Sequence, residues 1–204
     1  MKQGHYFYLT AIAAVLIIVV GGYVFLNLGT GDYKYRVVKD GIEFVSNDGI
    51  VSDLLTQIKT YPSITVSPRL VAQGPENSYM ATSITLFNTV LTAKRKKVVI
   101  VARVLDSKGN ILECQSNLGD PKVNRLLNAT ECGALINDAT SARVFVELPD
   151  EKLNRPRVVL ESGVIRIYPS SFESVSDVSF AVLNALYPDS AQIIASVNSY
   201  AQNI

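Results

Sequence analysis

Cys114 and Cys132 are the residues whose type and spacing most directly predict chemistry in this chain. They are its only cysteines. An even pair favours a disulfide in a domain that lies in an oxidising compartment. Closing the loop between them would stabilise the fold by roughly 3 kcal/mol in the chain-entropy model. The alternative is a pair of buried free thiols, since free cysteine behaves as a small apolar side chain.

Asn128 opens the only glycosylation acceptor, Asn128-Ala129-Thr130, which lies between the two cysteines. An N-x-[ST] triplet is modified only in chains exposed to the secretory machinery, so it predicts a folded body outside the cytoplasm. The alternative is that Asn128 or Thr130 caps a helix. The acceptor and the cysteines together favour an exterior body.

Catalytic motifs are scarce. The single histidine is His5, which excludes a Ser-His-Asp triad, a Cys-His pair and a His-ligated zinc site in the body. Two cysteines do not suffice for a four-thiolate zinc site. The patterns G-x-G-x-x-G, G-x-x-x-x-G-K-[ST] and G-x-S-x-G do not occur. We therefore expect no cofactor and no metal, and an enzyme would have to use carboxylates or a Ser/Lys pair.

The run Lys94, Arg95, Lys96 and Lys97 is the only charge cluster. It could contact phosphate, anionic lipid or an acidic partner. The alternative is structural, because cations after a helix complement its macrodipole and solvate the following turn. Aromatic residues do not interleave with the run and the net charge is +1, so nucleic acid is not an expected partner.

Strands and helices alternate through the body. Apolar alternation and turn residues predict strands over 33–38, 42–45, 64–66, 98–105, 111–115, 142–148, 158–161 and 164–168. Helical periodicity and capping residues predict helices from Ser52 to Pro62, over 78–93 and 130–139, from the Ser170–Glu173 capping box to Leu186, and after Pro188.

Hairpin turns are expected at Asp40-Gly41, Asp106–Asn110 and Ser162-Gly163. The strand–helix–strand units between Ile42 and Leu105 would add parallel pairs. The predicted class is therefore α/β or α+β, with one compact domain that has a mixed sheet and about five helices.

The N-terminal segment from Tyr6 to Leu28 is almost continuously apolar. As a helix it would be about 34 Å long, enough to cross a hydrocarbon core of about 30 Å. We predict a transmembrane anchor that contacts the lipid bilayer. A cleavable signal peptide and a buried helix are the alternatives. The predicted organisation is a tail at 1–5, the anchor at 6–28, a linker at 29–32 and one globular domain at 33–204.

Two sets of residues predict opposite orientations of the anchor. Lys34, Arg36 and Lys39 follow the apolar segment and Lys2 precedes it, so the positive-inside rule favours a cytosolic body. The cysteine pair and Asn128 favour the opposite side. We predict a single-pass protein of the cell membrane with an extracytoplasmic domain.

The segment Lys2-Gln3-Gly4 before the apolar run is faintly similar to the leader of type IV pilins. Pilins carry a glutamate five residues after the glycine, where this chain has Leu9, and pilin helices continue into the head, whereas Gly29 and Gly31 follow the run here. The resemblance implies a pilin-like filament subunit.

Three function hypotheses follow. The first is a non-catalytic binding or scaffold subunit of a cell-envelope complex, with a membrane or envelope protein as its partner. The second is a membrane-bound enzyme that uses carboxylates or a Ser/Lys pair. The third is the pilin-like filament subunit.

Overall fold

The structure, a computed structural model, describes residues 33–71, 74–106, 108–120 and 122–201. The described residues from Lys34 on belong to one compact unit. The predicted tail, anchor and linker at 1–32 lie outside the described residues. Within the described ranges, no helix is both long and apolar enough to cross a bilayer.

Among the described residues, nine strands form one sheet in the order β1-β2-β8-β9-β7-β3-β4-β5-β6. Parallel pairs join β2 to β8, β9 to β7, β7 to β3 and β3 to β4, and the remaining neighbours are antiparallel. The strands are β1 (Tyr35–Lys39), β2 (Ile42–Ser46), β3 (Ser63–Leu70), β4 (Lys97–Leu105), β5 (Ile111–Ser116), β6 (Arg125–Leu127), β7 (Ala142–Val146), β8 (Arg157–Glu161) and β9 (Val164–Tyr168).

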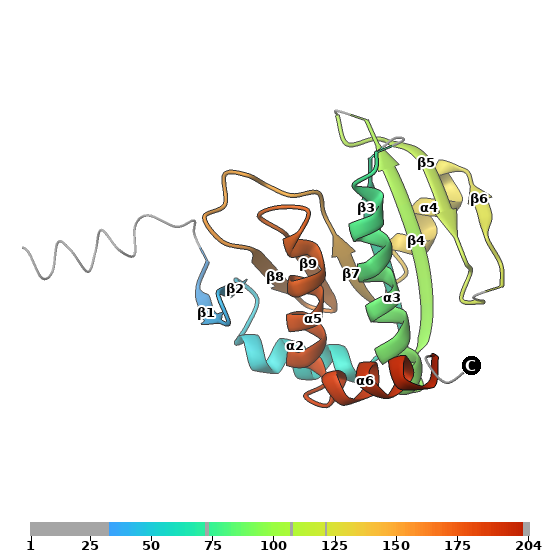
Figure 1. Cartoon of the computed structure of the whole chain (residues 1–204). Coiled ribbons are helices and arrows are strands. Elements are labelled where there is room, and N and C mark those ends of the chain that lie inside the picture. Colours follow the sequence, from blue (N-terminus) through green and yellow to red (C-terminus); the bar gives the residue numbers. More distant parts are fainter. Residues whose placement is uncertain (1–32, 72–73, 107, 121, 202–204) are drawn as a thin grey trace, which may run out of the picture. The chain divides into compact units, whose positions relative to one another are not determined.

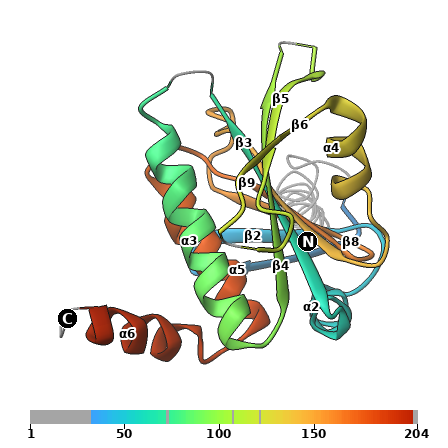
Figure 2. The same ribbon diagram turned by 90° about the vertical axis from the view of Figure 1, so that its right-hand side faces the viewer.

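The part of the chain that the structure describes has five helices, which cover the sheet unequally. They are α2 (Val51–Thr60), α3 (Asn77–Ala93), α4 (Ala129–Ile136), α5 (Ser174–Leu186) and α6 (Ser190–Ala201). Helices α2, α3 and α5 lie on one side of the sheet, with α6 at their lower end (Figure 1). Helix α4 lies on the opposite side, over β4, β5 and β6 (Figure 2). The class is therefore α+β with a mixed sheet, as the strand and helix patterns predicted.

The main core fills the space between the sheet and helices α2, α3 and α5. Alternate residues of each strand point to the helices, as the two-residue repeat of a strand requires. In α3, Met80, Phe87 and Leu91 are fully buried at the helical spacing expected from the sequence, and Ile84 between them is half-buried. This packing fixes which face of the sheet the helices cover.

A second, smaller core lies under α4. It contains Val99, Val101, Leu127 and the disulfide between Cys114 on β5 and Cys132 on α4, whose Cα atoms are 6.2 Å apart. The predicted disulfide is thus present in the structure. It links a strand near the end of the sheet to the only helix on that face among the described elements.

The three predicted hairpins are confirmed as β1/β2, β4/β5 and β8/β9. Asp40 and Gly41 adopt φ of 52° and 77°, the left-handed pair that a tight two-residue turn requires. Strand β4 lies inside the sheet, flanked by β3 and β5, in keeping with its nearly continuous apolar sequence.

Other boundaries were wrong. Helix α2 begins at Val51 and Ile50 precedes it, so Ser52 is not the cap. Helix α5 begins at Ser174, because Ser171 and Ser174 bond each other's backbone N–H groups and hold residues 170–173 in a turn. Strand β3 continues through Pro68, and β6 was not predicted.

Strand β2 is not a neighbour of β3. Strands β8, β9 and β7 lie between them, so the first strand–helix–strand unit does not make an adjacent parallel pair. The second unit does, since β3 and β4 are parallel neighbours.

Candidate partner-binding site

Strand β1 forms one edge of the sheet and all five of its residues are exposed. Valine and tyrosine favour extended backbone, and the Asp40-Gly41 turn returns the chain into β2. Val37 is 50% exposed and Val38 is 48% exposed, and they point to opposite faces of the strand. Each face of the edge therefore carries an exposed apolar side chain.

An apolar groove runs beside this edge on the helix-covered side of the sheet. Its volume is about 290 Å³, and its walls come from β1, β2, α2 and α5. The lining residues are Val37, Lys39, Phe44, Ile50, Val51, Ser52, Leu55 and Ala185. Val51, Leu55 and Phe44 also belong to the main core, so the groove is an opening of that core toward solvent.

The opposite face of the same edge is ionic. Glu43 on β2 is 2% exposed, and its carboxylate is paired with Arg36 of β1 and with Arg157 Nε of β8, the latter at 2.7 Å. A buried carboxylate needs cationic partners, because desolvation of an unpaired charge is expensive. The two arginines tie β1, β2 and β8 together and make the edge a fixed surface.

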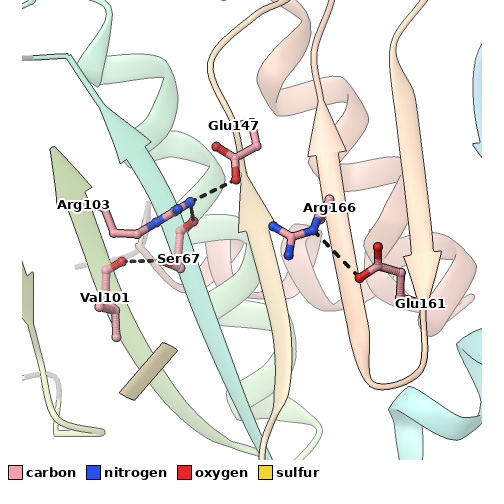
Figure 3. Close-up of polar contacts among 6 residues, drawn as sticks. All are labelled: Ser67, Val101, Arg103, Glu147, Glu161 and Arg166. Atoms are coloured by element: carbon pink, nitrogen blue, oxygen red, sulfur yellow. Dashed lines mark hydrogen bonds and ion pairs between the residues drawn. The ribbon is translucent and has the colours of Figure 1, made fainter. Parts of the chain in front are cut away.

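A second cluster crosses the middle of the sheet on the face that α4 partly covers (Figure 3). Between Val66 and Arg69, β3 has no register partners on β4. Ser67 Oγ donates to the carbonyl of Val101 at 2.8 Å, and Arg103 Nη2 donates to the carbonyl of Ser67 at 3.1 Å. These side chains replace the ladder hydrogen bonds lost around Pro68, which has no N–H.

Arg103 has a structural role, and of its nitrogens Nη2 makes the contacts, whereas the buried Nε has no hydrogen-bond partner among the described residues. Its Nη2 also pairs with Glu147 at 3.2 Å, and its guanidinium lies 5.0 Å from the ring centroid of Phe145. Arg166 lies 4.5 Å from the same centroid, and Figure 3 shows it turned toward Glu161. Because the Arg103 side chain is only 8% exposed, we interpret this cluster as a structural one that holds neighbouring strands together inside the sheet.

The side chains of the basic run at 94–97, which was predicted to contact an anion, do not form one surface. Lys94 pairs with Asp189 and lies 5.6 Å from the Tyr187 ring centroid. The Lys94 hydrogen bond lowers the pKa of the Asp189 carboxyl. Lys96 Nζ donates to the carbonyls of Lys59 and Tyr61, at 2.6 and 2.8 Å, and so satisfies the end of α2.

The other two cations of the run lie where the backbone passes from α3 into β4. Arg95 adopts a φ of 58° at the turn after α3, and Lys97 begins β4. Three of the four positions therefore serve the ends of α2 and α3 or the turn between α3 and β4. A contact with an anion remains a prediction.

Asn128 caps α4. Its Oδ1 accepts from the Glu131 N–H at 2.9 Å, and Glu131 Oε2 accepts from the Asn128 N–H at 3.1 Å, which completes a capping box. The alternative predicted for Asn128, that it caps a helix, is therefore confirmed. A glycan would attach to Nδ2, which this box does not use, so glycosylation stays a prediction.

Two further hollows open on the described surface. One, of about 460 Å³ between α3 and β5, is lined in part by the amides of Asn88, Gln115, Asn117 and Asn124. The other, of about 490 Å³, lies among α3, α5 and α6. Neither is lined by a residue of an edge strand. Within the described ranges, no group of three or more His, Cys, Asp or Glu side chains is placed to hold a metal ion.

Comparisons with known proteins give no identity. No family model, no curated protein and no solved structure matches the chain.

The groove was not predicted from the sequence. The strand at 33–38 and the helix beginning near Ser52 were expected, but the groove exists because Ala185 of α5 and Phe44 of β2 lie beside these two elements in space. One usable signal was Val37-Val38, two consecutive apolar residues in a strand beside a tight turn. A half-buried strand alternates, and a strand that is apolar on both faces is covered on both or binds something.

Proposed function

We propose that this chain is a membrane-anchored, non-catalytic assembly subunit of a cell-envelope complex, and that its folded domain binds a protein partner at the β1 edge. The observation that carries the proposal is the apolar groove beside an open, exposed edge strand. The anchor at 6–28 and the extracytoplasmic position of the domain are part of the same proposal.

The groove has the properties of a protein-recognition surface. It is small and open, and Ile50 and Val37 at its mouth are 54% and 50% exposed. Exposed apolar residues gathered beside a concave core opening mark interaction sites, whereas scattered ones do not. A side chain inserted there would contact Leu55 and Phe44, which are already held in place by the core.

The edge supplies the second element of recognition. An edge strand offers backbone N–H and C=O groups to an added strand, and pockets beside it select that strand's alternate side chains. Glu43, Arg36 and Arg157 hold β1 against β2 and β8, so the edge is organised before the partner binds. Such preorganisation reduces the entropy lost on association.

Alkylation of a cysteine at the groove tests the binding proposal. Ile50→Cys is placed in the full-length chain, and its rate of reaction with a small maleimide is measured in native membranes and in the detergent-purified monomer. Val197→Cys on α6 is the matched control, because Val197 is 46% exposed and lies outside the groove. We expect the membranes to slow reaction at position 50 by roughly tenfold, as burial in an interface does, and to leave position 197 unchanged. Equal rates at position 50 in both preparations would contradict the proposal.

A reporter cysteine tests the position of the domain. The native cysteines are 1% and 0% exposed and bonded to each other, so they do not report sidedness. Leu112→Cys is suitable because Leu112 is 67% exposed. Labelling by an impermeant maleimide in intact cells is the expected result, and labelling only after the membrane is breached would place the domain in the cytoplasm.

A further inference from the structure

We infer that the partner at the β1 edge is a second copy of this chain, and that the two β1 strands pair antiparallel about Val37. The inference rests on the proposed function, because it names the occupant of the same site. It joins two nine-stranded sheets into one continuous sheet.

The two edges of the sheet differ in how they are protected. Strand β6 has three residues and contacts α4, so that edge is short and partly covered. Strand β1 has five exposed residues, contains no proline and pairs with β2 in an uninterrupted register. Natural sheets shield their edges with prolines, bulges, covering elements or charged side chains. Among the described residues β1 has only the last of these, in Arg36, which is paired with Glu43, and in Lys39, so its backbone groups stay open to another strand.

Symmetry restricts how β1 can pair with its own copy. In an antiparallel pair, opposed residues both point their backbone groups toward the partner or both away from it. The two-fold axis that relates the strand to its copy therefore passes through a residue and not between two residues. Near the middle of β1, the three candidates are Arg36, Val37 and Val38. Centring on Arg36 would set Arg36 against itself, and like charges in direct opposition are destabilising.

Centring on Val37 gives complementary neighbours. Val37 then opposes Val37, Tyr35 opposes Lys39, and Arg36 opposes Val38 of the second copy. The pairing also brings Lys34 to Asp40 at the start of the turn, where opposite charges attract. It uses all five residues of the strand. Centring on Val38 would leave Tyr35 opposite the turn glycine, Gly41.

In the same register, side chains of the second copy also lie on the groove side of β1. Tyr35, Val37 and Lys39 share the face of Phe44, since β1 and β2 pair Val37 with Phe44 and Lys39 with Ile42. Tyr35 of the second copy therefore lies beside Lys39, which lines the groove. A tyrosine ring next to a lysine ammonium adds a cation–π contact, and tyrosine is among the residues that anchor interfaces.

Disulfide cross-linking tests the register in native membranes. Val37→Cys, Val38→Cys and Val197→Cys are each placed in the full-length chain, whose own two cysteines are bonded to each other. Val37 and Val38 are almost equally exposed, so reactivity alone does not separate them. We expect a dimer band at least about fivefold stronger for Val37→Cys than for the other two, because only residues whose Cα atoms lie within about 7 Å can form the bond.

Charge reversal provides a second readout in the same background. Lys34→Glu sets an acid against Asp40 of the second copy, and we expect it to reduce the Val37→Cys dimer severalfold. Lys152→Glu, at an exposed residue of the loop between β7 and β8, is the matched control and should leave the dimer unchanged.

Three results would overturn the inference. A Val38→Cys dimer as strong as that of Val37→Cys would contradict the register. A Val37→Cys dimer no stronger than that of Val197→Cys would contradict self-pairing. Insensitivity to Lys34→Glu would contradict the opposition of Lys34 and Asp40. Slow alkylation at Ile50→Cys without a Val37→Cys dimer would leave the proposed function standing with another protein as partner.

Discussion

Val37 on β1 lies directly opposite Phe44 on β2, and the two side chains share the face of the sheet that the helices cover. Phe44 is 3% exposed and belongs to the main core, whereas Val37 is half-exposed. The core therefore continues to the edge of the sheet and ends in an open apolar wall. This continuity is the reason that a partner at β1 would contact rigid side chains.

Loss of the disulfide should weaken the fold substantially. Cys114→Ser opens a loop of sequence separation 18 and leaves a hydroxyl in the small core beside Val101. We expect a loss of roughly 3 kcal/mol from chain entropy alone, measured as a lower melting temperature. Adding reductant should lower the melting temperature of the native protein and leave that of Cys114→Ser unchanged. Equal melting temperatures for the variant and the native protein would show that the bond contributes nothing.

The Glu43 cluster should matter far more than an exposed ion pair. Arg157→Ala removes one of two cations from a carboxylate that is 2% exposed. We expect a loss of about 1–3 kcal/mol, the range for a buried charged group that loses a hydrogen bond. Arg125→Ala is the control, because the Arg125–Glu131 pair is 55% and 39% exposed and such pairs contribute about 0–1 kcal/mol. Urea unfolding measures both, and equal effects would contradict the account of this edge.

Gly163 is a position where backbone geometry requires glycine. Its φ is 70°, and an added Cβ would lie 2.8 Å from the Tyr61 hydroxyl oxygen. Gly163→Ala should destabilise the β8/β9 hairpin by roughly 1–2 kcal/mol. Gly133→Ala in α4 is the matched control, since its Cβ meets no atom within 4 Å and alanine favours a helix by about 1 kcal/mol. Thermal unfolding should move in opposite directions for the two variants, and a shared direction would refute the prediction.

Acid should destabilise the loop between β4 and β5 through Asp106. The Asn110 side chain, followed by backbone N–H groups of Asn110 and Lys108, lowers the pKa of Asp106 below its ordinary value of 3.8. A carboxyl whose pKa is lower in the folded state stabilises the fold above the unfolded pKa, and this contribution disappears as the pH falls through the folded pKa. Asp106→Asn should therefore lose less stability than the native chain between about pH 5 and pH 2. Urea midpoints at the two pH values measure this, and parallel losses would disprove it.

Local features of the fold were predictable from the sequence, and long-range ones were not. Asp40-Gly41 and Ser162-Gly163 indicate their hairpins because their residue types favour the left-handed turn conformation. The insertion of β8 and β9 between β2 and β7 has no local signal, since it depends on which strand edges meet during folding. The Glu43–Arg157 pair, 114 residues apart in the chain, follows from that insertion.

The candidate site shows the same division. The strand around Val37 and the helix around Leu55 were expected from periodicity. Their meeting with Ala185 of α5 depends on the packing of α5 against α2, which the sequence pattern does not specify. The basic run at 94–97 is evident in the sequence. Its Lys96 nevertheless caps the end of α2, because Nζ donates hydrogen bonds to the carbonyls of Lys59 and Tyr61.

Photo-cross-linking in intact cells shows whether a protein occupies the groove beside β1. A photoreactive amino acid replaces Ile50 in the full-length chain, and the same amino acid at Val197 serves as the control. We expect a light-dependent adduct of one defined mass from position 50 and not from position 197, with twice the chain mass if the partner is a second copy. No adduct at position 50, or the same adducts from both positions, would contradict the proposal.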